Sequence, residues 1–128
     1  MYATSPAESV HALDVDALTA PSITFFTARD DGLLLGCGAL REIDPTHAEI
    51  KSMRTTAAAR GRGVADAVLA RMTQVATGRG YTRLSLETGV EDYFAAARRL
   101  YLRNGFVDCE PFGDYRPDRH SVFLTKDL

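Results

Sequence analysis

The chain has 128 residues and a mass of 14.0 kDa, so we expect a single domain over residues 1–128. Hydrophobic residues make up 45% and charged residues 25% of the sequence, which excludes an intrinsically disordered chain. The net charge of −2 removes a general attraction to nucleic acid, and the longest nearly apolar stretch, Leu33 to Leu40, is too short to span a membrane. Two cysteines and no visible secretory leader predict a cytoplasmic protein.

The first half of the chain predicts one helix and then three strands. The motif Ser5-Pro6-Ala7-Glu8 is a capping pattern and begins a short helix over residues 5–18. Asp31-Gly32 is typical of a tight hairpin turn between two strands. The predicted strands cover residues 23–28, 33–41 and 48–55.

The second half alternates helices with strands. Apolar residues recur at helical spacing and predict an amphipathic helix from Gly63 to about Thr77. A strand at 82–87, a helix at 92–103 and strands at 106–109 and 121–125 follow. This order predicts an α/β fold with helices packed on one central sheet.

Charge is spread unevenly along the sequence. Residues 1–50 carry two basic and eight acidic groups, residues 51–103 carry ten and four, and residues 104–128 carry three and five. A basic centre in an acidic protein predicts one localised site for a polyanion. An arginine-rich solvated helix face is the alternative interpretation.

A glycine-rich turn, Arg60-Gly61-Arg62-Gly63-Val64-Ala65, lies between a predicted strand and an amphipathic helix. Glycines let the backbone approach a ligand, and a new helix presents N–H groups that attract phosphate. The turn lacks the lysine of a P-loop, and Asp66 stands where a dinucleotide fingerprint needs a small residue. It is therefore either a phosphate cradle of another kind or an ordinary tight turn.

Two motifs together resemble a known family. The pattern Arg-x-x-Gly-x-Ala at Arg60, Gly63 and Ala65 is similar to the acetyl-CoA signature of the GNAT superfamily of N-acetyltransferases, and the segment from Ala97 through Leu100-Tyr101 to Gly105-Phe106 resembles its helix-to-strand landmark. The resemblance runs from about residue 22 to the end, and the tail is similar to a small bacterial subgroup. It implies a mixed, mostly antiparallel sheet with flanking helices, splayed between its fourth and fifth strands for acetyl-CoA.

The resemblance also implies which residues contact acetyl-CoA. Backbone groups of Met53, Arg54 and Thr55 would pair with the pantetheine arm, and the turn would hold the pyrophosphate. The implied cofactor-binding residues are Met53, Arg54, Thr55, Arg60, Gly61, Arg62, Gly63, Val64 and Ala65. The sequence departs from the family at Phe94, where an asparagine is common, and the family's first strand and first helix are expected to be absent.

Two residues are candidates for the catalytic chemistry of acetyl transfer, which needs a base for the amine and an acid for the departing thiolate. The resemblance implies that Glu49 is the base; a strand-end surface carboxylate paired with Lys51 is the alternative. Tyr101 matches the family tyrosine that protonates the coenzyme A thiolate, although its helix stripe with Phe94 and Ala97 also suits a core residue.

These observations predict an acetyl-CoA-dependent N-acetyltransferase that acts on a primary amine of a small molecule, amino acid or peptide. An acyl-CoA-binding module with little or no activity is the alternative.

No histidine pair has ligand spacing, so no metal is expected. By resemblance, Tyr115, Arg116 and Arg119 lie in a loop that borders the acceptor site. An uncovered edge strand near Ile23 predicts a homodimer.

Overall fold

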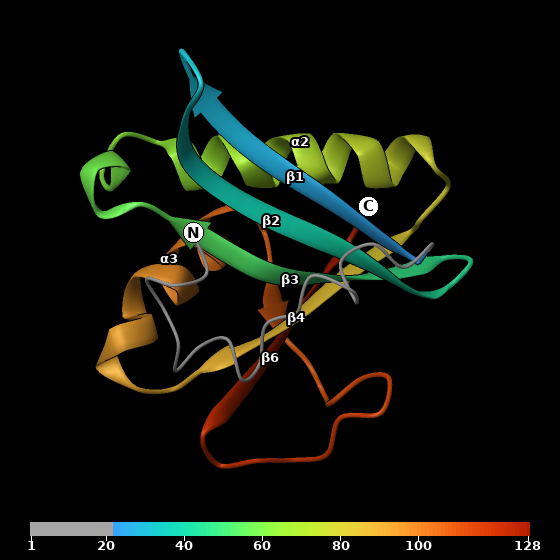
Figure 1. Cartoon of the computed structure of the whole chain (residues 1–128). Helices are drawn as coiled ribbons and strands as arrows, with labels where there is room; N and C mark the ends of the chain where they lie inside the picture. Colours follow the sequence, from blue (N-terminus) through green and yellow to red (C-terminus); the bar gives the residue numbers. More distant parts are fainter. Residues whose placement is uncertain (1–21) are drawn as a thin grey trace. The chain divides into compact units, whose positions relative to one another are not determined.

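The computed structural model of the protein describes residues 22–128, so the helix predicted at 5–18 lies outside the described residues. The strands are β1 (Ile23–Asp30), β2 (Leu33–Asp44), β3 (His47–Thr55), β4 (Arg83–Gly89), β5 (Val107–Asp108) and β6 (Ser121–Asp127). The helices are α2 (Val64–Gly78) and α3 (Ala95–Arg103), with 3₁₀ turns η3 (Ala57–Ala59) and η4 (Asp92–Phe94) (Figure 1). No helix within residues 22–128 is long and apolar enough to cross a membrane.

The six strands hydrogen-bond in the order β1-β2-β3-β4-β6-β5, which is a mixed and mostly antiparallel sheet. Strands β3 and β4 form a parallel pair, whereas β1–β2, β4–β6 and β5–β6 are antiparallel. The chain forms two compact units, one of Met1–Glu42 with Ile50–Met72 and one of Ile43–Glu49 with Thr73–Leu128. Strand β3 contributes residues to both units.

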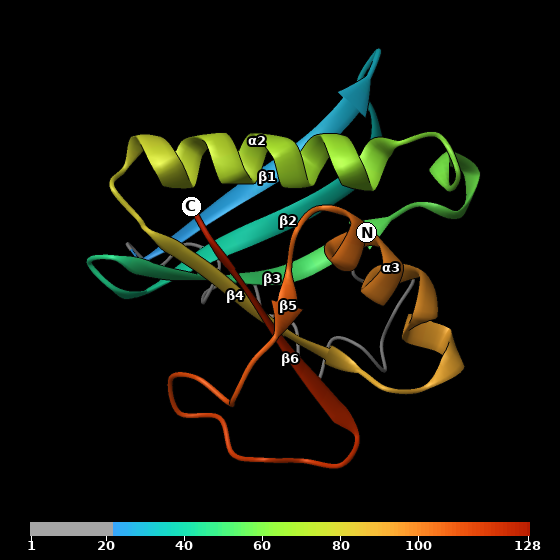
Figure 2. The same ribbon diagram turned by 180° about the vertical axis from the view of Figure 1, so that it is seen from behind.

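The first unit contains the β1–β2 hairpin and the first part of α2, which crosses behind β1 and β2 in Figure 1 and in front of them in Figure 2. The hairpin turn has both central residues left-handed, with φ of 49° at Asp31 and 81° at Gly32, as a two-residue turn requires. Gly38 of β2 has no room for a side chain, because a Cβ there would lie 2.6 Å from the Met53 sulfur and 2.7 Å from the Met72 sulfur. The helix therefore packs closely on this strand.

The second unit is built around β4, which pairs with β3 on one side and β6 on the other. Side chains alternate along β4, so the buried Leu84 and Leu86 share one face, whereas Ser85 and Glu87 share the other. Helix α3 adds the buried Leu100 and Tyr101 to this unit. The polar face of β4 lies beside Glu49 of β3, whose register partner on β4 is Ser85.

Within residues 22–128, the predicted elements are present with shifted ends. The helix predicted at 92–103 divides into η4 and α3, and the ring of Phe94 between them lies against Gly89, where a Cβ would collide with that ring. The strand predicted at 106–109 shrinks to Val107–Asp108, because Phe106 turns into the core instead of pairing. The mixed, mostly antiparallel sheet with flanking helices is confirmed.

Candidate active site

Glu49 lies where the parallel ladder between β3 and β4 ends. The ladder joins His47 to Arg83, Ala48 to Leu84 and Glu49 to Ser85, whereas β3 continues to Thr55 and β4 to Gly89. The Glu49 side chain is only 1% exposed. The alternative of a strand-end surface carboxylate is therefore wrong, and a carboxylate this deeply buried requires hydrogen-bond partners.

The Tyr115 hydroxyl donates to Glu49 Oε2 at 2.5 Å. Tyr115 belongs to the long connection between β5 and β6, which forms the large loop at the bottom of Figures 1 and 2. Both residues belong to the second unit. The sequence placed Tyr115 only in a loop and gave no signal for this contact, because the two residues are 66 positions apart.

A chain of hydrogen bonds runs across the same polar face of the sheet. His47 Nε2 lies 2.6 Å from Ser85 Oγ, which lies 2.9 Å from Thr125 Oγ1, and the Thr125 hydroxyl donates to the Leu84 carbonyl at 3.1 Å. Because each hydroxyl has one proton, Thr125 accepts from Ser85, and Ser85 accepts from the Nε2–H of His47. The chain thereby fixes the tautomer of His47.

The electrostatic surroundings of His47 favour its neutral form. Burial lowers the pKa of His47 below its ordinary value, and the positive charge of Arg83 lowers it further. The nearby charges of Asp44 and Glu49 oppose this shift without cancelling it. His47 is half-buried, and its hydrogen bond to Ser85 joins residues 38 positions apart, so it was not predicted from the sequence.

A second carboxylate, Glu87, lies on the same face of β4 as Ser85. The Ser121 hydroxyl donates to Glu87 Oε2 at 2.6 Å. Glu87 was not among the predicted site residues, although its position two residues after Ser85 in an alternating strand was a usable signal.

Tyr101, the predicted acid, lies in α3 and is 4% exposed. Its ring packs edge-on against Phe106 with centroids 5.6 Å apart. Tyr101 and Glu49 therefore belong to the same unit, whereas the predicted cofactor-binding residues all belong to the first unit.

The predicted phosphate turn leads into α2. Gly61 and Gly63 have left-handed φ values of 75° and 77°, and a Cβ built on either would meet nothing within 4 Å. These glycines are therefore needed for backbone conformation, and the space beside them is open. The Ala67 N–H donates to the Gly63 carbonyl at 3.0 Å, so the hydrogen bonds of α2 begin at Gly63 and the turn lies at the positive end of the helix dipole.

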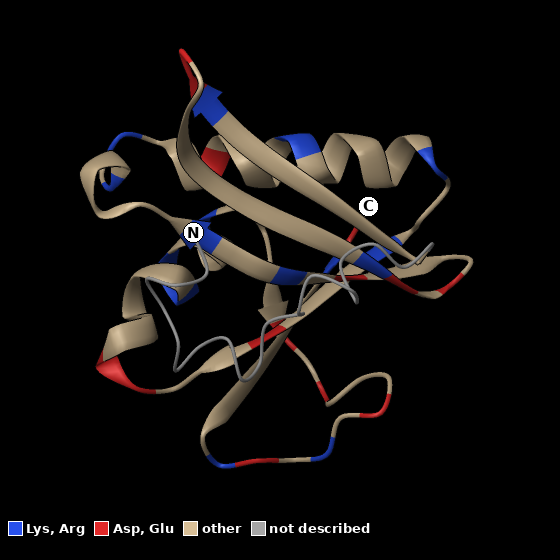
Figure 3. Ribbon diagram, in the orientation of Figure 1, with Lys and Arg blue, Asp and Glu red and all other residues tan. Residues whose placement is uncertain are grey.

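Arginine side chains flank this turn. Arg60 and Arg62 are both exposed, and Figure 3 shows basic residues on β3 and on the turn that follows it. One acidic residue, Asp66, lies in the first turn of α2. An exposed basic turn beside a helix N-terminus is chemically suited to an anion.

The strand before this turn is irregular at Ser52, which has a left-handed φ of 58° although it is not glycine. Within residues 22–128, Ser52 Oγ is the buried side-chain polar atom that has no hydrogen-bond partner. Met53, Arg54 and Thr55 follow directly, and Gly36 brings Arg54 close to the helix start, because a Cβ at Gly36 would lie 2.9 Å from both the Arg54 carbonyl and a Val64 methyl group. The two parts of the predicted cofactor set are therefore neighbours.

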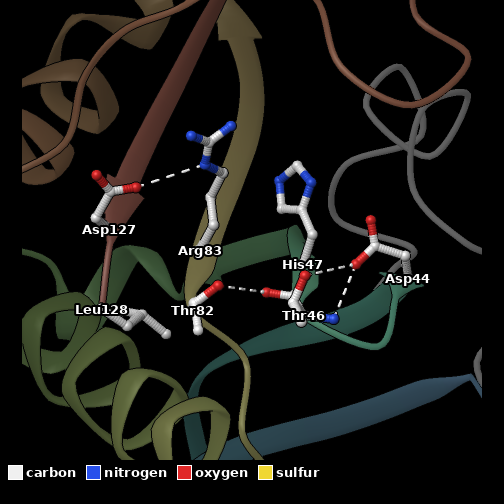
Figure 4. A pocket seen from close by; sticks show the side chains of 7 residues that line it. All are labelled: Asp44, Thr46, His47, Thr82, Arg83, Asp127 and Leu128. Atoms are coloured by element: carbon white, nitrogen blue, oxygen red, sulfur yellow. Dashed lines mark hydrogen bonds and ion pairs between the residues drawn. The ribbon is translucent and has the colours of Figure 1, made fainter.

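An open pocket of about 470 Å³ lies where β3 and β4 begin and β6 ends (Figure 4). The exposed side chains of Arg83 and Asp127 form an ion pair of 3.5 Å along it, and Asp44 accepts from Thr46. Its lining residues are Asp44, Thr46, His47, Thr82, Arg83, Asp127 and Leu128. It contains none of the predicted site residues, and no group of three potential metal ligands occurs in residues 22–128.

Comparison with known proteins decides the family. The sequence model of the acetyltransferase (GNAT) family matches residues 2–106. The chain belongs to the GNAT acetyltransferase family. It is thus an acyltransferase enzyme of the N-acetyltransferase type, as the two sequence motifs indicated.

Two curated GNAT relatives match nearly the whole chain. The uncharacterized N-acetyltransferase YsnE of Bacillus subtilis is 53% identical over 97% of this chain and 82% of its own length. The IAA acetyltransferase of Azospirillum brasilense is 41% identical over 96% of this chain and 80% of its own length.

Solved structures share the fold. A candidate acyl-CoA N-acyltransferase of Klebsiella pneumoniae has a TM-score of 0.86 and 31% identity, and the match covers 98% of this chain and 86% of that one. A GNAT acetyltransferase of Elizabethkingia anophelis, solved with acetyl-CoA bound, has a TM-score of 0.70 and 21% identity, covering 84% and 77%. At that identity the second likeness concerns the fold alone.

Proposed function

We propose that this GNAT protein transfers an acetyl group from acetyl-CoA to a primary amine of a small molecule, amino acid or peptide. The observation that carries the proposal is the buried Glu49 carboxylate at the end of the β3–β4 ladder. A buried carboxylate with a hydroxyl donor is suited to accept a proton from an ammonium group.

In the proposed mechanism, Glu49 accepts a proton from the substrate and Tyr101 donates a proton to the leaving group. Glu49 removes a proton from the ammonium, and the free amine nitrogen then attacks the thioester carbonyl carbon directly. When the tetrahedral intermediate collapses, the carbon–sulfur bond breaks and Tyr101 protonates the departing thiolate. The nitrogen of the new amide loses its second excess proton, which restores the Tyr101 hydroxyl, and Glu49 releases its proton to solvent. The products are the amide and free coenzyme A, and the acetyl group never forms a covalent bond to the enzyme.

We propose the exposed turn Arg60–Ala65 as the pyrophosphate site and Met53–Thr55 as the pantetheine site. Support for the first comes from the open space beside Gly61 and Gly63 and from the N-terminus of α2, whose dipole attracts anions. Support for the second comes from Ser52 Oγ, because a buried polar atom without a partner requires an explanation such as a ligand that is bound in function.

Release of the coenzyme A thiol from acetyl-CoA, followed across a panel of aliphatic and aromatic primary amines and amino acids, tests the proposal. We expect turnover with at least one amine, and a large loss of that turnover in Glu49→Gln, whose side chain has nearly the same shape but cannot act as a base. The loss should be greatest at low pH, where little free amine is present. Acetyl-CoA binding without turnover by any amine would favour the acyl-CoA-binding module.

We also propose that the chain forms a homodimer, because β1 is a terminal strand of the sheet order. The cytoplasmic location remains a prediction from the sparse cysteines.

A further inference from the structure

The connection between β5 and β6 contacts the start of β3 at the buried Glu49. There the Tyr115 hydroxyl donates to Glu49 Oε2 at 2.5 Å. Glu49 is 1% exposed, so this hydrogen bond forms away from bulk water. A hydrogen bond to a charged acceptor in such surroundings is stronger and more directional than one at the surface.

The position of Tyr115 is set by a tight turn. The Tyr115 N–H donates to the Phe112 carbonyl at 3.1 Å, and Gly113 between them has a left-handed φ of 57°. A Cβ at Gly113 would meet nothing within 4 Å, so glycine is needed there for its backbone conformation. The turn places the Phe112 and Tyr115 rings side by side.

Two aromatic rings, those of Phe112 and Phe123, pack against the Tyr115 ring. Its ring centroid lies 5.2 Å from that of Phe112 and 5.6 Å from that of Phe123, and the latter two are 5.9 Å apart. Phe123 is buried in β6, so the cluster ties the loop to the sheet. Tilted and edge-on packing of this kind restricts the ring to one orientation, which fixes the direction in which the hydroxyl points.

We propose that Tyr115 is a positioning residue that holds the Glu49 carboxylate in one rotamer for proton transfer from the acceptor amine. This inference rests on the proposed function, because it assigns Tyr115 to the base of that reaction. Tyr115 keeps its own proton throughout; the proton that moves goes from the ammonium nitrogen to Glu49. A preorganised base needs less rearrangement on the way to the transition state.

A double-mutant cycle on turnover tests the role. We measure coenzyme A release from acetyl-CoA, with the fastest amine of the panel, for Tyr115→Phe, Glu49→Gln and the double variant. We expect Tyr115→Phe to lower kcat roughly tenfold with little change in the KM for acetyl-CoA. In the Glu49→Gln background the same change should cause no further loss, because Tyr115 acts through Glu49. Tyr93→Phe, a tyrosine that is 64% exposed, serves as the matched control and should retain wild-type kcat.

An unchanged kcat in Tyr115→Phe, or an equal loss in both Glu49 backgrounds, would overturn the assignment. A second cycle, measured by urea unfolding with Tyr115→Phe and Glu49→Met, tests the contact without relying on activity. We expect a coupling of at least about fivefold in the unfolding equilibrium constant, and additive effects would also overturn the inference. If the wild-type chain turned over no amine while this coupling was present, the proposed function would fail and the positioning contact would stand.

Discussion

The Tyr101 side chain is only 4% exposed. A substitution that tests its role as a proton donor must therefore keep the aromatic ring, so that the packing of the core changes little. Tyr101→Phe preserves the edge-on contact with Phe106 and removes the proposed proton donor. We expect turnover to fall on the order of a hundredfold or more, whereas calorimetric affinity for acetyl-CoA changes little. Tyr81→Phe, at a tyrosine 9% exposed in the same unit, is the control and should leave turnover unchanged. Wild-type turnover in Tyr101→Phe would identify Tyr101 as a core residue.

His47 gives a prediction about stability and pH. Burial lowers its pKa in the folded protein, Arg83 adds to the effect, and Asp44 and Glu49 oppose it. The unfolded chain therefore binds a proton at higher pH than the folded one does, so stability should fall as the pH drops below about 6.5. His47→Gln removes the titrating ring, so its urea midpoint should decline less than the wild-type midpoint between about pH 7 and pH 5.

The control for this measurement is His120→Gln, because the His120 side chain is exposed. Its urea midpoint should follow the wild-type pH response. Parallel curves for wild type and His47→Gln would show that His47 does not contribute to the pH dependence of folding. The same result would question the hydrogen-bond chain through Ser85 and Thr125, since that chain fixes the tautomer of His47.

At the level of elements, the turn before α2 carries the proposed pyrophosphate site. Gly63→Glu adds a side chain and a negative charge at the proposed phosphate site, so acetyl-CoA binding measured by calorimetry should be abolished. Gly80→Glu is the matched control, because Gly80 is also left-handed, with φ of 89°, and a Cβ there also meets open space. That variant should bind acetyl-CoA with wild-type affinity. Unchanged binding in Gly63→Glu would remove the site assignment.

Elements with a strong local signal were predictable from the sequence. The Asp31-Gly32 turn was predicted, and both of its central residues have the left-handed φ values that such a turn requires. The apolar periodicity predicted α2 to within about one residue at each end. The order of helices and strands was therefore recoverable from local rules, and the family resemblance added the sheet type.

Features that depend on tertiary contacts were not predictable. Ser52 has a left-handed φ within a strand, and nothing in the residues around it signals that conformation. The Tyr115–Glu49 hydrogen bond joins residues 66 positions apart, and the His47–Ser85 contact joins residues 38 apart. Local propensity contains no information about such pairs, so the partners of the predicted base came only from the three-dimensional structure.

At the level of the whole molecule, the exposed apolar side chains of the first hairpin bear on assembly. Among residues 22–128, β1 pairs with β2 and stands at the end of the strand order. Phe25 of β1 is 36% exposed and Leu33 of β2 is 65% exposed. A strand at the end of a sheet that carries exposed apolar side chains invites pairing with another chain, so we expect a homodimer that buries on the order of 1,000 Å² or more.

Light scattering across a range of protein concentrations measures this assembly. The wild-type chain should give twice the mass of one chain, and Leu33→Lys should shift it toward the monomer, because a charge at an apolar interface must be desolvated. Leu102→Lys is the control, since Leu102 of α3 is 54% exposed and lies outside the first hairpin, and it should remain dimeric. A wild-type monomer at every concentration would contradict the dimer. Dissociation by Leu102→Lys but not by Leu33→Lys would move the interface from the β1–β2 hairpin to the face of α3, so the pair of variants locates the interface as well as testing its existence.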